Sequence, residues 1–228
     1  MRFSFRTAPS LLLVVLTVAA CAAGTGTVQP SSGPVIVTPQ PVTVARGADT
    51  SANGQHAYTA ADINFMGGMI SHHAQALVMA GWSNSHGASP SVLTLSARIT
   101  NAQQDEIAGM QRWLRDRHQT VPEANPHGMV MKMDGIEHVM LMPGMLTEAQ
   151  LKQLDAARGK EFDRLFLTFM IQHHSGAVSM VNDLFGTYGA AQDITVFKMA
   201  SDISADQTTE IERMRKMLGA LIFGANTP

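Results

Sequence analysis

Two stretches of this sequence repeat each other about a hundred residues apart. "FMGGMISHHAQALVMA" covers residues 65–80, and "FLTFMIQHHSGAVSMV" covers residues 166–181. The positions that they share are Phe65/Phe166, Met69/Met170, Ile70/Ile171, His72/His173, His73/His174, Ala76/Ala177 and Met79/Met180. An internal repeat of this kind indicates that the fold is built from two copies of one structural unit.

A second pair of matching stretches follows the first pair, one in each half of the chain. "ITNAQQDEIAGMQRWL" matches "ISADQTTEIERMRKML". The shared positions are Ile99/Ile203, Gln103/Gln207, Glu106/Glu210, Ile107/Ile211, Met110/Met214 and Leu114/Leu218. The offset between the copies grows from 101 to 104 residues, so the loop inside the second half should be about three residues longer. Each half is therefore predicted to be a helical hairpin.

The apolar residues from Thr59 onward recur at helical spacing, and strand signals are nearly absent, so the predicted fold class is all-α. The long helices are expected to cover Thr59 to about Ser85, Pro90 to His118, and a segment that starts near Lys160. A short extra helix should begin with a Thr147/Gln150 capping box and stop at Gly159. A lone hairpin cannot bury its apolar side, so the two copies should form a four-helix bundle with an approximate two-fold axis.

The N-terminus resembles an export signal. Arg2 and Arg6 precede an apolar run over residues 11–20, which is too short for a mature membrane helix. The run ends in "VAAC", so residues 1–20 are predicted to be a lipoprotein signal peptide and Cys21 the lipidated residue; an ordinary signal with a stray cysteine is the alternative. The protein would then be exported and anchored to a membrane, facing the periplasm or the cell exterior. Since Cys21 is the only cysteine, no intramolecular disulfide can form.

Three further segments follow from composition. Residues 21–56 are rich in Ala, Gly, Thr, Pro and Val and are predicted to be a flexible tether. The bundle should occupy residues 57–222 and include a Met- and His-rich linker at 125–146. The net charge is −2 and no basic patch is present, which gives no indication of nucleic-acid binding.

The repeated histidines share a helix face with methionines. At about 100° per residue, Met69, His72 and Met79 fall on the face that enters the core. A buried neutral imidazole needs a hydrogen bond or a metal ion. The candidate metal ligands on the four helices are Met69, His72, His73, Met79, Met110, Met170, His173, His174, Met180 and Met214. The alternative is structural: one histidine of each pair bonds Glu106 or Glu210, and the methionines are core residues.

The linker holds a second group of candidate ligands. These are His127, Met129, Met131, Met133, His138, Met140, Met142 and Met145. The segment lacks a 3.6-residue period and contains too many Gly and Pro residues for a buried helix. Thioethers favour Cu(I) and cannot be lost to disulfide formation, which suits an oxidising compartment. An adaptable hydrophobic contact surface is the alternative for this segment.

The two "FxxxMIxHHxxAxxM" stretches, the run "EFDRLFLTFMIQHH" and the preceding "MPGMLTEAQL" resemble the bacterial family known as domain of unknown function 305, over most of residues 60–222. The resemblance implies a ferritin-like fold, and some periplasmic members are associated with copper binding and copper resistance. It points to Met69, His72, His73 and Met79, and to Met170, His173, His174 and Met180. The first motif differs by having Gly67 and Gly68 where the second has Leu167, Thr168 and Phe169 around the same place, which should loosen that turn.

The predicted function is therefore an extracytoplasmic copper-binding lipoprotein that sequesters or relays metal, not an enzyme. Cu(I) is the favoured ion, with Cu(II) or Ag(I) as alternatives, and a copper-exchange protein is a candidate partner. Two other functions remain open. One is a ferritin-like di-iron oxidase using Asp62, Asp163, Glu106 and Glu210, although neither half has a Glu-x-x-His motif ending in the histidine pair. The other is a metal-free scaffold lipoprotein.

Overall fold

The computed structural model describes residues 57–133 and 135–224. The predicted signal peptide, Cys21 and the tether lie outside the described residues, and so do the side chains of residues 131–133. The elements are α1 (Ala60–Gly81), α2 (Pro90–Asp116), β1 (Met129–Met133), β2 (Ile136–Met140), α3 (Glu148–Ala156), α4 (Gly159–Gly186) and α5 (Ile194–Phe223). None of the helices in this part of the chain is long and apolar enough to span a membrane.

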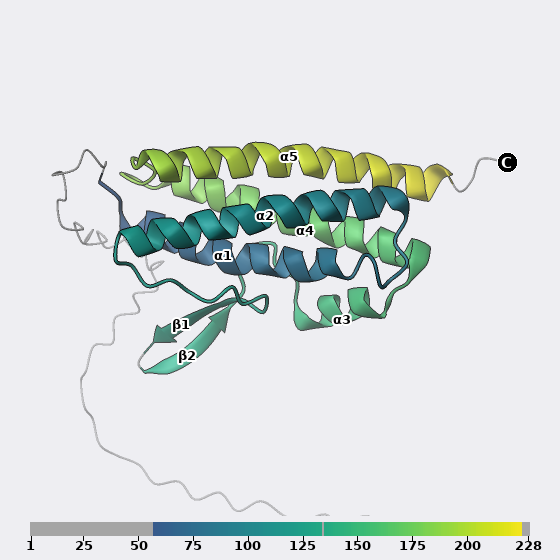
Figure 1. The fold of residues 1–228 in the computed structure, drawn as a ribbon, viewed down its shortest axis with the longest axis horizontal. Coiled ribbons are helices and arrows are strands. Elements are labelled where there is room, and N and C mark those ends of the chain that lie inside the picture. Colours follow the sequence, from purple (N-terminus) through teal and green to yellow (C-terminus); the bar gives the residue numbers. More distant parts are fainter. Residues whose placement is uncertain (1–56, 134, 225–228) are drawn as a thin grey trace, which may run out of the picture. The chain divides into compact units, whose positions relative to one another are not determined.

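The four long helices form the predicted bundle of two hairpins (Figure 1). Helix α1 packs along α2, and α4 packs along α5, while α1 and α4 contact each other across the middle. Helix α3 packs on α4, and strand β1 lies against α1. The repeated histidine motifs are therefore carried by the two helices that meet at the centre.

Aspartates near the helix starts tie each half to the other. Asp62 forms a capping box with Thr59 and also accepts a hydrogen bond from the backbone N–H of Ala191, 2.7 Å away in the α4–α5 loop. Its counterpart Asp163 accepts from the backbone N–H of Ser89 in the α1–α2 loop, at 3.1 and 3.3 Å. Both carboxylates are thus structural in this fold, which removes them from the predicted di-iron ligand set.

Two predicted details of the hairpins are wrong. Helix α1 ends at Gly81 and not near Ser85, because residues 82–87 form turns that place the buried His86 ring against α3. The second hairpin also lacks a longer loop: the connection at residues 187–193 is no longer than the one at 82–89. The additional residues extend helix α4 beyond the histidine pair instead.

The linker contains regular structure that the sequence did not indicate. Strands β1 and β2 pair antiparallel, with Met129 opposite Met140 and Met131 opposite His138. Gly135 supplies the positive φ of 81° in the tight turn. The residues of β2 are exposed, so neither burial nor a strong apolar alternation marks this ribbon in the sequence.

The core is divided into two apolar clusters that exchange methionines between the halves. One cluster contains Met69 and Met110 from the first half with Met180 from the second. The other contains Met170 and Met214 from the second half with Met79 from the first. The approximate two-fold relation predicted from the repeat therefore extends to core packing.

Candidate metal centre

The four repeated histidines lie in the interior, on the contact between α1 and α4. His72, His73, His173 and His174 each have 0% exposure. The rings of His72 and His173 lie 3.8 Å apart between centroids, and each lies about 6 Å from the ring of its sequence neighbour. The fold therefore brings both predicted histidine pairs to one place.

His73 and His174, the second and here called the outer histidine of each pair, bond a glutamate from the partner helix of their own hairpin. His72 and His173 are called the inner histidines. His73 Nε2 lies 2.7 Å from Glu106 Oε2, and His174 Nε2 lies 2.8 Å from Glu210 Oε2. These are the bonds that the structural alternative predicts. They use only one nitrogen of each ring, so they leave the other available.

The inner histidines bond backbone carbonyls. His72 Nε2 donates to the Pro143 carbonyl oxygen at 3.0 Å, and His173 Nε2 donates to the His72 carbonyl oxygen at 3.0 Å. Because a carbonyl oxygen can only accept, the ring proton of each neutral imidazole is on Nε2 and its lone pair is on Nδ1.

All four Nδ1 atoms are buried and have no hydrogen-bond partner in the described part of the chain. Leaving a buried polar atom unpaired costs about 1–3 kcal/mol. Metal-binding histidines commonly donate their second ring N–H to a carboxylate or a backbone carbonyl, which fixes the tautomer and orients the free nitrogen. The four rings have this arrangement, with Nδ1 as the free nitrogen in every case.

Burial keeps the inner imidazoles neutral. It lowers the pKa of His72 well below its ordinary value, with a further lowering from the charges of His73 and His174. Burial also lowers the pKa of His173 well below the ordinary value, followed by the charges of its histidine neighbours. The pKa of His174 is lowered by burial too, although its bond to Glu210 opposes this shift. Neutral rings are the form that can coordinate a metal ion.

The helix methionines predicted as ligands are buried in the same bundle as the histidines. Each core cluster contributes three of them, and all lie in the protein interior. Met69 and Met170 each lie one helical turn before the inner histidine of their own helix, a spacing that places side chains next to each other. At these two positions a thioether therefore lies beside the inner histidine.

The linker methionines were predicted to form one group of ligands, but they divide into two groups in the structure. The first group is seated against the core: Met145 is buried and its Sδ accepts a bond from the backbone N–H of Met142, at 3.3 Å. Met142 is half-buried beside Gly68, where an added Cβ would come within 2.9 Å of its Sδ. Gly68 thus admits a linker sulfur one turn before His72, inside a regular helix and not in a loosened turn.

Gly176 allows the same segment to approach α4. A Cβ at this position would lie 1.9 Å from the Pro143 carbonyl oxygen and 2.6 Å from Gly144 Cα. The carbonyl in question is the acceptor for His72 Nε2. Close contact of the linker with α4 therefore places the acceptor for His72 Nε2.

The second linker group lies outside the core. His127, His138 and Met140 are exposed, and Met129 is half-buried over Gly67. The ring of His127 bonds Glu148 at the start of α3. These residues are not brought to the histidine centre.

Two contributors to the centre were not predicted. Pro143 supplies a carbonyl oxygen, which no side-chain pattern can reveal. Gln75 fixes the linker: its Oε1 accepts from the backbone N–H of Leu146 at 2.6 Å, and its Nε2 donates to the carbonyl oxygens of Pro126 and Leu146 at 2.9 and 3.1 Å. The available signal was a polar residue two positions after the histidine pair, in the otherwise apolar stretch 74–81.

No three His, Cys, Asp or Glu side chains in the described part of the chain converge closely enough to hold one metal ion. Coordination by these histidines therefore requires thioether sulfurs in the ligand set or a rearrangement of the rings. Buried methionines are present in both core clusters, and soft sulfur with imidazole is a donor set that selects Cu(I) over hard cations.

Comparison with known proteins assigns the family. The model described as Domain of unknown function (DUF305) matches residues 62–218. The chain belongs to this family. The resemblance seen in the sequence is thereby confirmed, and no curated protein matched the chain.

Solved structures similar to this chain share its all-α bundle. A DUF305 protein from Streptomyces coelicolor, inferred to be secreted, is 26% identical, with a TM-score of 0.58 over 71% of this chain and 93% of that one. A DUF305 fragment from Deinococcus radiodurans is 26% identical, with a TM-score of 0.59 over 71% and 97%. CopM in its Cu(I)-bound form is 27% identical, with a TM-score of 0.51 over 68% and 94%. CopM structures with Cu(II) and with silver are also similar. The prediction of a ferritin-like four-helix bundle is confirmed.

Proposed function

We propose that this protein binds copper outside the cytoplasm and sequesters or relays it as Cu(I). One observation carries the proposal: four buried imidazoles each bond an oxygen acceptor through Nε2, and their Nδ1 atoms have no hydrogen-bond partner among the described residues. Four unpaired nitrogens are costly in a core that serves only packing. Coordination of a metal ion would satisfy them.

The choice of copper follows from the surrounding sulfur. Met69, Met110 and Met180 on one side and Met79, Met170 and Met214 on the other are proposed to complete the ligand sets. Thioethers are soft ligands that need no deprotonation, which favours Cu(I) and Ag(I) over Zn(II) or iron. The similar CopM, solved with Cu(I), Cu(II) and silver, supports this choice.

The linker offers a route for copper into the centre. Met140 is 42% exposed, Met142 is half-buried and Met145 is 5% exposed, so thioethers at decreasing exposure lead from the β ribbon toward the core. We propose that the ribbon, with Met129, Met131, Met133, His127 and His138, collects Cu(I) and passes it inward or to an exchange partner.

The proposed location rests on the N-terminal sequence and on the similar protein inferred to be secreted. Export would use residues 1–20, and a lipid on Cys21 would hold the protein at a membrane. Replacing Cys21 with Ser should then release the protein from membranes into the soluble fraction after signal cleavage, as measured by fractionation and immunoblotting. A Cys21→Ser protein that is cleaved and still sediments with membranes would contradict lipid anchoring.

Loading with single metals tests the function. Purified protein is incubated separately with Cu(I) under reducing conditions, with Zn(II) and with Fe(II), and bound metal is counted after desalting. We expect tight copper binding and no retained iron. Retention of iron together with oxygen consumption would instead support a di-iron oxidase, and retention of no metal would support a scaffold role.

A further inference from the structure

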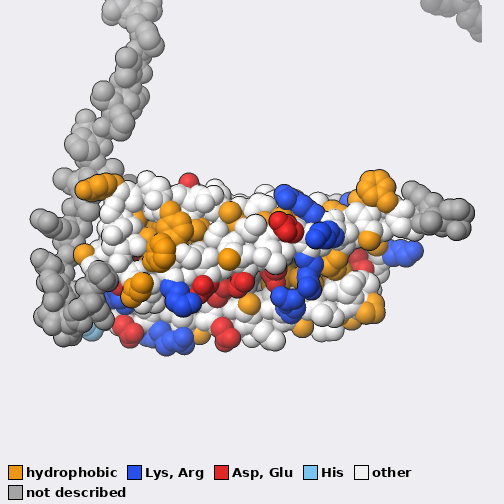
Figure 2. Space-filling model, turned by 90° about the horizontal axis from the view of Figure 1, so that it is seen from above, with side chains coloured by type: hydrophobic (Ala, Val, Ile, Leu, Met, Phe, Trp, Pro, Cys, Tyr) orange, Lys and Arg blue, Asp and Glu red, His pale blue; other side chains and the backbone are white. Residues whose placement is uncertain are grey.

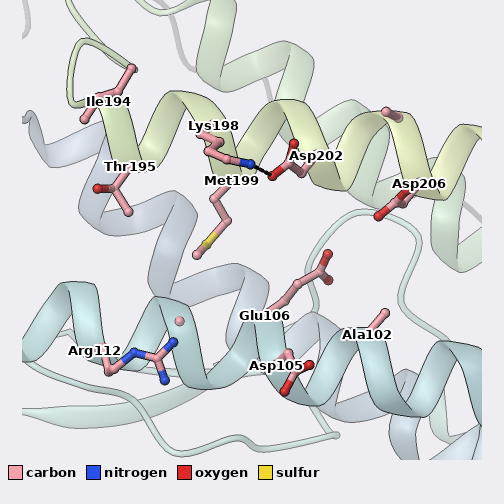
Figure 3. Close-up of a pocket in the computed structure, with 12 residues that line it drawn as sticks. Ala102, Asp105, Glu106, Arg112, Ile194, Thr195, Lys198, Met199, Asp202 and Asp206 are labelled. Atoms are coloured by element: carbon pink, nitrogen blue, oxygen red, sulfur yellow. Dashed lines mark hydrogen bonds and ion pairs between the residues drawn. The ribbon is translucent and has the colours of Figure 1, made fainter.

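A cavity of about 110 Å³ lies between α2 and α5, on the side of the bundle away from the α1–α4 contact. Its polar lining consists of Arg98, Gln103, Glu106, Asp206, Gln207, Thr209 and Glu210. It adjoins a wider groove of about 640 Å³ between the same helices, which shares Glu106 and Asp206 with it. Figure 3 shows these two carboxylates, one from each helix, pointing into the space between α2 and α5.

The two glutamines in this cavity are buried and unsatisfied. Gln103 and Gln207 are each 2% exposed. Both amide atoms of Gln103, and Oε1 of Gln207, lack a hydrogen-bond partner in the described part of the chain. They occupy equivalent positions in the repeat, and both side chains line the cavity. This points to a ligand, because buried amide groups are normally paired.

The charge around the cavity is unbalanced. Three carboxylates, Glu106, Asp206 and Glu210, face one cation, Arg98, and no ion pair joins Arg98 to any of them among the described residues. Burial, followed by the charges of Glu106 and Glu210, raises the pKa of Asp206. Figure 2 shows the face that carries α5, with acidic side chains in a row and basic ones at its flanks. A local excess of two negative charges matches one divalent cation.

We propose that this cavity binds a hydrated divalent cation of the hard, oxygen-preferring class, held by Glu106, Asp206, Glu210 and the amide oxygens of Gln103 and Gln207. Mg²⁺ and its relatives retain several waters when bound to proteins. At about 30 Å³ per water, the cavity has room for roughly three or four waters, or for an ion with part of its shell. A retained shell agrees with the finding that no three acidic or histidine side chains of the described chain converge for direct coordination.

The cation would also sit next to the histidine centre. Glu106 and Glu210 each give Oε2 to a histidine, whereas Oε1 makes no hydrogen bond with the described residues. The cation would thus contact the far side of the carboxylates that orient His73 and His174. This site has hard oxygen donors, does not depend on the copper proposal, and can be tested in copper-free protein.

Titration with Mn²⁺, followed by electron paramagnetic resonance, tests the site in the copper-free full chain. The signal of free aqueous Mn²⁺ should fall with a saturable stoichiometry of one, and Mg²⁺ should restore it by competition. Asp206→Asn should weaken Mn²⁺ binding at least tenfold. Asp202 lines only the wider of the two cavities and pairs with Lys198, so Asp202→Asn is the matched control. It should change Mn²⁺ binding less than twofold.

Gln103→Leu separates a cation site from a cavity that holds only water. The change removes one amide oxygen at similar volume, and it should weaken Mn²⁺ binding severalfold while leaving Cu(I) stoichiometry unchanged. It also removes an unpaired amide, so this variant is expected to fold even if Asp206→Asn does not. The proposal is overturned by an absence of saturable Mn²⁺ binding up to millimolar concentration, by equal effects of Asp206→Asn and Asp202→Asn, or by unchanged Mn²⁺ binding in Gln103→Leu.

Discussion

Two regions of this chain are similarly rich in methionine and histidine but lie in opposite surroundings. In the repeated helix motifs, the inner residues such as His72, Met69 and His173 are fully buried, and each histidine is fixed by a hydrogen bond through Nε2. In the linker ribbon, His138 and Met140 are exposed. Ligand chemistry alone therefore does not define a binding site, because the surroundings decide whether a donor is already oriented and neutral.

The two regions should therefore bind copper by different rules. In the core, the unpaired Nδ1 atoms are held ready, and binding should be tight and sensitive to protons. In the ribbon, the methionine side chains must lose conformational freedom when they bind copper, so their affinity for Cu(I) should be lower. Thioethers carry no proton near neutral pH, so this affinity should not depend on pH there. The segment from Met142 to Met145 packs against the core, although it follows the ribbon almost directly in the sequence.

The largest expected effect comes from removing the inner pair. His72→Leu combined with His173→Leu should abolish most tightly bound Cu(I), counted by metal analysis after dialysis against a competing chelator. Leucine has a similar volume and eliminates two unpaired buried nitrogens, so the free energy of unfolding should change by no more than about 2 kcal/mol.

The matched control for this change is Met129→Leu with Met140→Leu, which alters the ribbon and leaves the core intact. That variant should retain the tight copper. Equal losses from both variants would remove the distinction between the two regions.

The next effect concerns stability against acid in the copper-free protein. The pKa values of His72, His173 and His174 are lowered in the folded state, so below pH 6.5 the unfolded chain binds more protons than the folded one. The stabilisation is complete above about pH 6.5 and is lost as the pH falls. At pH 5.5 the loss should reach up to about 1.4 kcal/mol for each of the three histidines.

Urea denaturation at pH 7.5 and 5.5 measures this dependence. The His72→Leu, His173→Leu variant should lose the larger part of it, because only the lowered pKa of His174 remains. An unfolding free energy that stays constant between the two pH values in the native protein would contradict neutral, buried imidazoles.

A smaller effect is expected from breaking the contact between linker and core. Gly176→Ala places a methyl group where the Pro143 carbonyl lies, and both nearest atoms belong to backbone that cannot simply rotate away. We expect a loss of roughly 1–3 kcal/mol in the free energy of unfolding and weaker Cu(I) binding, since His72 loses its acceptor.

Gly186→Ala in the same helix is the control, because nothing lies within 4 Å of its added methyl group. It should leave the protein as stable or slightly more stable, by up to about 1 kcal/mol. A Gly176→Ala protein that behaves like Gly186→Ala in thermal melting would show that the linker is not seated on α4.

The smallest effect should come from the ribbon itself. Replacing Met129, Met131, Met133 and Met140 with Leu should leave the fold and the tight copper unchanged, and should remove only weakly held Cu(I). Because thioethers carry no proton near neutral pH, this weak fraction should persist in the native protein at pH 5 under reducing conditions. If the leucine variant binds as much Cu(I) at pH 5 as the native protein, the ribbon is a contact surface.

Much of the fold followed from the repeat alone. Two copies of one apolar helical hairpin leave few ways to bury their faces, so the four-helix bundle and the central position of His72 and His173 could be predicted. The capping box at Thr147 was predicted correctly because its chemistry is local. The early end of α1 and the extension of α4 were missed, since tertiary contacts and not local preference decide where these helices stop.

The candidate site was predictable only in its side chains. Repeated histidines and methionines on one helix face indicate a common location, and Glu106 and Glu210, which are equivalent positions of the repeat, were named as histidine partners in the structural alternative. The Pro143 carbonyl could not be predicted, because backbone acceptors leave no mark in a sequence. The division of the linker at Met142 depends on two glycines far away in the chain, Gly68 and Gly176, whose role becomes visible only in three dimensions.

The most direct test of the central proposal is to observe which ring nitrogen binds the metal. Long-range ¹H–¹⁵N spectra of the protein loaded with diamagnetic Ag(I) or Cu(I) report the two nitrogens of each histidine separately. We expect Nδ1 of His72, His73, His173 and His174 to shift or couple to the metal, while Nε2 keeps its proton. Unchanged Nδ1 resonances in the core, with metal detected only at the linker, would contradict a histidine centre in this bundle.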